Sequence, residues 1–251
     1  MKLPLALAAA LFAAAASVPQ ESGPETAHRP ASRAAAPLFV GETLRYAMTI
    51  LGVAAGEIVL SAASDEQEGR PAYRLEMTIS TNDFVSKLYY VRDSLRSWVD
   101  PQTLASLCFD EHTAEGRRVR EETAVFDLEQ LVVRRGNKVM PISIPTFDAL
   151  SSVYFLRTLA LKGPEPVALS VVGRDVFTLQ VAIQGRETVT TPAGTFRTIR
   201  LEPKSPGENL IGKGKNLILW VTDDERKLPA QIKSRLSVGT LIGKLKAIEP
   251  P

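Results

Sequence analysis

Hydrophobic and polar residues alternate along most of the chain from residue 38 onward. The clearest run is 73–80, in which Tyr73, Leu75, Met77 and Ile79 fall on one face. Alternation with period two over about eight residues is typical of a strand with one buried face. The same pattern predicts strands over 43–50, 56–62, 73–80, 88–99, 106–113, 118–126, 130–135, 167–172, 176–183, 187–191, 195–202, 216–221, 230–236 and 240–248.

One segment has a helical period instead. Residues 149–161 carry apolar side chains at helical spacing, namely Leu150, Val153, Leu156 and Leu159. Asp148 stands at the start as an expected N-cap, because its carboxylate can accept from the free amides of the first turn. Gly163 and Pro164 are expected to stop the helix. A shorter turn of helix is predicted over 83–87.

Many strands and one central helix predict a mainly β fold, or β-dominated α+β, over a single domain at 38–251. We expect a large curved antiparallel sheet, or an open barrel or sandwich, around the helix near 149–161. Turn residues punctuate the strands, for example at Gly69, Gly116 and Gly136. A βαβ alternation is absent, which argues against a Rossmann or barrel enzyme.

The N-terminus resembles a targeting segment. Lys2 is followed by a Leu, Ala and Phe run and by small residues at 14–16, so residues 1–19 are predicted to be a cleaved signal peptide. A buried helix or membrane anchor is the alternative, but the run is shorter than the ~18 residues of a spanning helix. Residues 20–37 are predicted to be a flexible leader. No cysteine stands near the end of the apolar run, so we expect a periplasmic protein without a lipoprotein anchor or a transmembrane span.

Composition adds mainly exclusions. The 251 residues are 45% hydrophobic and 23% charged, with a formal net charge of +2. Collagen-like, coiled-coil and wholly disordered chains are therefore excluded, and charge offers no argument for nucleic acid. The single cysteine, Cys108, excludes an internal disulfide. Its apolar neighbours favour burial over pairing between chains.

Recognisable catalytic and cofactor motifs are missing. There is no Gly-rich phosphate loop, HExxH, GxSxG or CxxC, so we expect no cofactor and no metal, and we favour a protein that is not an enzyme. Cys108 and His112 would lie about 13 Å apart on one strand, too far for a dyad. An enzyme that uses paired carboxylates is left open. Its candidates are Asp93, Asp110, Glu111, Asp127, Asp223 and Asp224, of which Asp223 and Asp224 read more simply as a hairpin turn.

Two basic features, the charged run 115–122 and Arg157, have two interpretations each. The charged run 115–122 is expected to place Arg118 and Arg120 near Asp110 and His112, either as a solvated strand face or as an anionic-ligand or membrane-surface patch. Arg92 and Arg157 stand among apolar residues, where a buried charge needs a partner. Arg157 is predicted to pair with Asp93 or Asp148, and an anion site is the alternative.

Several phrases, in order, resemble an exported bacterial family known as domain of unknown function 3108. They are GETLRY at 41–46 with Ala55-Gly56, NDFVSKLY at 82–89, Arg92-Asp93 with 97–100, DALSSVYFLRTL at 148–159, GRETVTTPAGTF at 185–196 and WVTDDERKLP at 220–229. The resemblance implies an envelope protein but no established activity, so it transfers no catalytic residues. Exported lipoprotein-carrier proteins are broadly similar, curving an antiparallel sheet around a helix and holding acyl chains in the hollow.

These observations favour non-catalytic binding of an apolar or amphipathic envelope component, such as a lipid. The binding model requires an apolar cleft beside the helix. We predict that the ligand-binding residues are Tyr89, Arg92, Tyr154, Arg157, Lys213 and Lys215, with the loop 205–215 as a gate. An assembly or scaffold protein with an envelope protein partner is the alternative, and it requires an exposed edge strand. A carboxylate-dependent enzyme on envelope polysaccharide is the third model.

Overall fold

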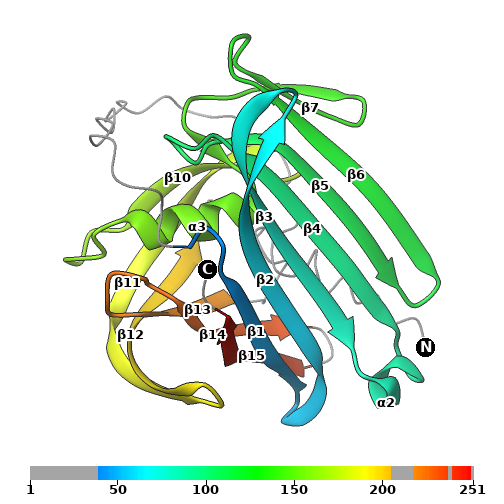
Figure 1. Ribbon diagram of the computed structural model, residues 1–251, viewed down its shortest axis with the longest axis vertical. Helices are drawn as coiled ribbons and strands as arrows, with labels where there is room; N and C mark the ends of the chain where they lie inside the picture. The colour runs from blue at the N-terminus through cyan, green and yellow to red at the C-terminus, as the bar shows by residue number, and fades with distance from the viewer. Residues whose placement is uncertain (1–38, 205–216, 237–238, 250–251) are drawn as a thin grey trace.

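The computed structural model describes residues 39–204, 217–236 and 239–249. All of its strands belong to one sheet of fifteen strands, and the sheet curls around helix α3 (Figure 1). The predicted signal peptide and leader, and the loop with Lys213 and Lys215, lie outside the described residues.

Most strands are followed directly by another strand, so the chain forms a series of hairpins with few helices between them. The strands are β1 (Thr43–Ile50), β2 (Val53–Gln67), β3 (Arg70–Thr81), β4 (Val91–Val99), β5 (Ser106–Glu115), β6 (Arg118–Asp127), β7 (Val132–Arg135), β8 (Lys138–Pro141), β9 (Thr146–Phe147), β10 (Val167–Val172), β11 (Val176–Thr191), β12 (Gly194–Lys204), β13 (Leu217–Thr222), β14 (Pro229–Leu236) and β15 (Gly239–Glu249). The helices are α2 (Asp83–Ser86) and α3 (Ala149–Thr158).

The order of the strands shows how the sheet closes. From one edge to the other it runs from β8 back to β1, then from β15 back to β9, and only the β9–β10 pair is parallel. The two edge strands, β8 and β9, are therefore neighbours in sequence, joined by residues 142–145. Side chains of β7 and β8 also contact the β10–β11 turn, near the other edge of the sheet. Arg135 Nη1 donates to the Gly173 carbonyl at 2.8 Å, and Lys138 Nζ lies 3.0 Å from Asp175. The result is a barrel-like curl.

Bulges supply much of the curvature. The register shifts at Arg45/Tyr46, at Met48/Thr49 and at three other places, and each extra residue bends the strand and increases its twist. At one bulge the structure differs from the sequence prediction, which gave separate strands at 176–183 and 187–191. The shift between Ile183 and Gly185 lies inside the continuous strand β11, so a bulge bends this strand where the sequence predicted a break.

The predicted mainly β class, with a large curved sheet and a central helix, is confirmed. Strands 43–50 and 167–172 have the predicted bounds. The helix is shorter than predicted, because the backbone of Leu159 is extended (φ −86°, ψ 151°) and the chain leaves the helix three residues early to bury Leu161. Strand β9 was not predicted, since two residues carry no periodic pattern.

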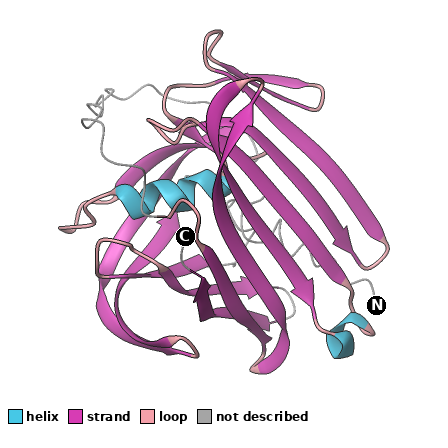
Figure 2. Ribbon diagram, viewed as in Figure 1, coloured by secondary structure: helices cyan, strands magenta, loops and turns pink. Residues whose placement is uncertain are grey.

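Helix α3 lies across the hollow of the sheet and completes its core (Figure 2). Its N-terminus is held by Asp148, as predicted. The fully buried carboxylate accepts from the backbone N–H groups of Leu150 and Ser151 and from the hydroxyls of Ser97 and Ser106. The Ser151 hydroxyl in turn accepts from the backbone N–H of Asp148, which completes a capping box. Burial raises the pKa of Asp148. The cap thus fixes α3 to strands β4 and β5.

We expect Asp148→Ala to lower the free energy of unfolding by about 3 kcal/mol, because it leaves two buried hydroxyls and two helix amides without their acceptor. Asp127, which accepts from the N–H groups of Glu129 and Gln130 in a turn, provides the matched control. Asp127→Ala should cost about 1 kcal/mol. Urea unfolding followed by circular dichroism measures both, and equal losses would contradict the anchoring role of Asp148.

Candidate functional site

An apolar cavity of about 60 Å³ lies between helix α3 and the inner face of the sheet. The helix contributes Leu150, Val153 and Leu156 to its wall, and the sheet contributes side chains from both halves of the chain, among them Met77, Leu219 and Ile232. These residues are buried or half-buried because the helix and the strands present their apolar faces to the same hollow. The cavity therefore has the almost wholly apolar wall that the binding model requires.

One residue of the cavity wall carries a polar atom without a partner. Tyr46 of strand β1 lines the cavity and is only 2% exposed, yet its hydroxyl makes no hydrogen bond among the described residues. Burial raises the pKa of Tyr46 well above its ordinary value, so the hydroxyl stays protonated and able to donate. A buried hydroxyl without a partner costs free energy.

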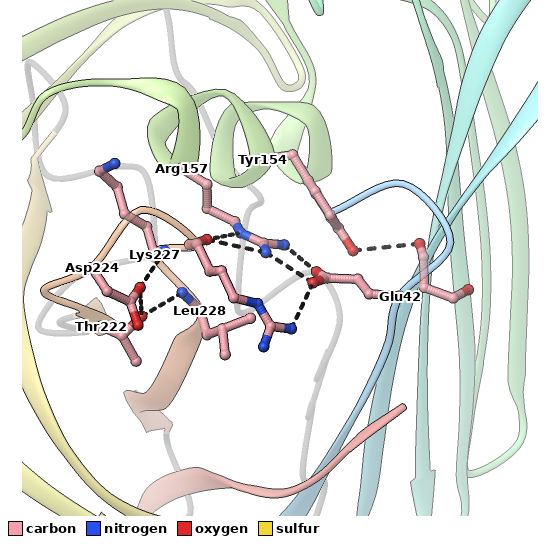
Figure 3. A network of polar contacts seen from close by, with 9 residues as sticks. Glu42, Tyr154, Arg157, Thr222, Asp224, Lys227 and Leu228 are labelled. Carbon is pink, nitrogen blue, oxygen red and sulfur yellow. Dashed lines mark hydrogen bonds and ion pairs between the residues drawn. The ribbon is translucent and has the colours of Figure 1, made fainter. Parts of the chain in front are cut away.

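A buried ion pair stands at the other end of α3 (Figure 3). Arg157 donates from both terminal nitrogens to the carboxylate of Glu42, with Nη2 3.1 Å from Oε2. Arg157 also donates to the backbone carbonyl of Arg226, and the Arg226 guanidinium lies 3.8 Å from Glu42. Both side chains of the pair are buried: the exposed fraction is 2% for Arg157 and 0% for Glu42. The pair connects α3 to the start of β1 and to the β13–β14 turn.

Aromatic rings enclose the guanidinium of Arg157. Its central carbon lies 5.4 Å from the ring centre of Phe39 and 5.2 Å from that of Tyr154, and these two rings meet edge to face at 4.9 Å. The Tyr154 hydroxyl donates to the Ser61 carbonyl at 3.4 Å (Figure 3). Burial raises the pKa of Tyr154. Tyr154 and Arg157 thus bind other parts of the protein, and they are absent from the wall of the cavity.

The predicted partners of Arg157 were wrong. Asp148 caps the opposite end of the same helix, about 14 Å away at 1.5 Å per residue, and Asp93 accepts from the backbone N–H of Ala114. The partner, Glu42, lies 115 residues away in sequence. The phrase GETLRY at 41–46, noted for its family resemblance, contains both Glu42 and Tyr46, and that was the one sequence signal for either residue.

The other predicted ligand-binding residues lie elsewhere. Arg92 follows α2, donates to the Thr81 carbonyl at 3.3 Å and lies over the ring of Tyr90. Tyr89 also follows α2, which lies at one end of the sheet, whereas α3 lies in the hollow of the sheet (Figure 1). Lys213 and Lys215 lie outside the described residues. The structure therefore separates Tyr89 and Arg92 from Tyr154 and Arg157 instead of bringing the four together.

The predicted neighbours of Arg118 and Arg120 were also wrong. The tight β5–β6 turn pairs Glu115 with Arg118 and Thr113 with Arg120. Paired residues share a face of the sheet, so these arginines project to the face opposite Asp110 and His112. His112 contacts Glu121 instead, and Asp110 accepts from Thr123.

The carboxylates considered for an enzyme have structural partners. Asp223 pairs with Arg186, and Asp224 accepts from Thr222 and from the backbone N–H of Lys227 in the β13–β14 turn. Glu111 pairs with Arg135. In the part of the chain that the structure describes, no three His, Cys, Asp or Glu residues gather where they could hold a metal ion.

Comparison with known proteins identifies the family. The model of a family described as protein of unknown function (DUF3108) matches residues 45–246, so the chain belongs to that family. The fold is similar to a crystal structure from Brucella abortus, a beta-barrel-like protein of domain of unknown function DUF1849. The two are 12% identical, with a TM-score of 0.58, over 86% of this chain and all of the other. A Bacteroides fragilis protein with a YmcC-like fold is 11% identical over 85% of this chain and 97% of its own, with a TM-score of 0.32.

Comparison with curated proteins finds no match. Among the described residues, the helices are all too short or too polar to cross a membrane. The shared fold of the Brucella abortus protein supports the barrel-like architecture and carries no activity to this chain.

We expect Arg157→Leu to lower the free energy of unfolding by about 3–5 kcal/mol, because it leaves the Glu42 carboxylate buried without its main partner. The double variant Glu42→Leu/Arg157→Leu removes both charges and should lose much less than the sum of the single changes. Thermal and urea unfolding of the four proteins in a double-mutant cycle measures the coupling. Additive losses would show that the pair does not act as a unit.

The single cysteine is buried, as predicted, with 7% exposure. Burial raises the pKa of Cys108 to about 11, so only about one thiol in a thousand is ionised at pH 8 in the folded protein. We expect iodoacetamide to label Cys108 at pH 8 at least about tenfold more slowly in the native protein than in urea. Mass spectrometry follows the labelling, and equal rates would contradict the burial.

Proposed function

We propose that this protein is exported and binds an apolar or amphipathic molecule of the cell envelope, without catalysis. The observation that carries the proposal is the apolar cavity beside α3, whose wall includes Tyr46, a residue with an unpartnered hydroxyl. Binding sites for small molecules are typically apolar with a few polar groups that fix orientation. Export rests on the signal peptide that residues 1–19 predict.

The volume of the cavity limits the size of the group that can enter it. Its volume of about 60 Å³ is far below the ~300–1,000 Å³ of pockets that enclose whole drug-sized molecules. It suits a narrow apolar group, such as the terminal carbons of an acyl chain, better than a ring system.

The other two models have less support. Strand addition needs a length of free backbone, but the edge strands β8 and β9 have four and two residues. The carboxylates of the enzyme model are held by arginines or by turn amides rather than converging in a groove. Non-catalytic binding is the function that the geometry supports best.

Native mass spectrometry of the mature protein purified from the periplasm, with lipid extraction, tests the proposal directly. A co-purifying acyl species at near-stoichiometric amount is the expected result. A clean apo mass, together with failure to bind added cis-parinaric acid, would overturn it.

Variants within helix α3 locate the site. Val153 lines the cavity, so Val153→Trp should fill it and weaken binding of cis-parinaric acid by about tenfold or more. Thr158 is exposed on the same helix and is not part of the cavity wall, so Thr158→Trp is the matched control and should bind normally. Fluorescence titration gives both affinities. Normal binding by Val153→Trp would place the ligand elsewhere.

A further inference from the structure

Large apolar side chains are exposed around the short helix α2. Phe84 and Leu88 are 66% and 79% exposed, and Tyr90, just beyond them, is 42% exposed. The helix buries none of its own residues, although Asn82 caps it and Val85 packs against the core from one side. The segment is therefore held in place while Phe84 and Leu88 point away from the protein.

The topology brings two further loops to the same end of the sheet. In an antiparallel sheet, alternate connections lie at one end, so the β1–β2 turn, α2 and the β5–β6 turn are neighbours (Figure 1). Asn82 Nδ2 donates to the Ala54 carbonyl, and the Gly116 N–H donates to the Tyr90 carbonyl, both at 2.8 Å. These turns add exposed Leu51, Val53 and Val119. We call this set, with Phe84, Leu88 and Tyr90, the α2 surface.

Basic side chains accompany the α2 surface. Lys87, Arg92, Arg117 and Arg118 are exposed in the same connections, and Asp83 and Glu115 are the acidic residues there, so the local excess is positive. The β1–β2 turn itself, residues 51–54, carries no charge. Exposed apolar groups beside cations are the combination that an anionic membrane surface recognises, because the apolar groups enter the interface while the cations meet phosphates.

We propose that the α2 surface docks the protein on a membrane that contains anionic phospholipids. Phe84 and Leu88 enter the headgroup region, and Lys87, Arg92 and Arg117 contact lipid phosphates. The surface belongs to elements separate from the cavity beside α3, so the proposal does not depend on the proposed ligand. Contact with a second copy of the chain, or with a protein partner, is an alternative outcome of the test.

Co-sedimentation of the mature protein with vesicles tests the docking. Vesicles of phosphatidylglycerol and phosphatidylcholine should bind the protein, vesicles of phosphatidylcholine alone should bind it several-fold less, and added salt should weaken binding. Equal binding to both kinds of vesicle, or binding to neither, would overturn the proposal.

Paired variants locate the contact. Phe84→Gln/Leu88→Gln should reduce binding to the anionic vesicles by about tenfold or more, whereas Leu131→Gln/Val139→Gln, which changes exposed apolar residues of the β6–β7 turn and β8, should leave it unchanged. Lys87→Glu/Arg117→Glu should reduce binding as well, by about fivefold or more for each charge. Its charge-matched control, Arg70→Glu/Arg197→Glu, changes exposed arginines on other elements.

Two further measurements test whether the variants fold and whether the protein self-associates. Thermal unfolding shows whether each variant folds, and if the Phe84/Leu88 variant does not, the charge-reversal pair decides the question alone. Sedimentation velocity gives the oligomeric state. A dimer that the Phe84/Leu88 variant abolishes, without vesicle binding by the wild-type protein, would assign the α2 surface to a second copy and overturn membrane docking.

Discussion

The buried pair of Arg157 and Glu42 is the contact on which the arrangement of helix α3 depends. Each charge is withdrawn from water, so each is tolerable only with the other in place. Because Glu42 precedes β1 and the carbonyl of Arg226 lies in the β13–β14 turn, one guanidinium connects the helix to both halves of the sheet. Asp148 performs the same task at the other end of the helix, toward β4 and β5.

Anchors at both ends explain the cavity between them. A curled sheet of fifteen strands leaves a wide hollow, and within the described residues α3 is the one helix of more than a single turn available to fill it. Because polar contacts hold both ends of α3 at a fixed distance from the sheet, the middle of the helix cannot approach β1, β2 and β13 more closely. The space left over is therefore almost wholly apolar, and Tyr46, whose hydroxyl has no partner among the described residues, forms part of its wall. A binding site of this kind follows from how the helix is held rather than from a set of convergent polar residues.

The two proposed surfaces use different parts of the same fold. The cavity belongs to α3 and the strands under it, whereas the α2 surface belongs to the connections at one end of the sheet. The basic residue Arg92, expected at the ligand site, lies at the α2 surface instead. The charged run after Glu115, for which a membrane-surface patch was one of two interpretations, borders it as well.

The alternation of residues by itself predicted the mainly β class and most strand positions, because one-sided burial imposes period two on each strand. It also predicted the helix and its Asp148 cap, since both are local. What the sequence could not predict are the contacts between distant segments, namely the partnership of Arg157 with Glu42 and the contacts of Arg135 and Lys138 with the β10–β11 turn. The register that turns Arg118 and Arg120 away from Asp110 is local, but the tight β5–β6 turn sets it and the alternation of residues does not. The distant contacts depend on how the sheet curls, and periodicity does not encode the bulges that supply much of this curvature. The cavity and the α2 surface exist only once that curl has brought their elements together.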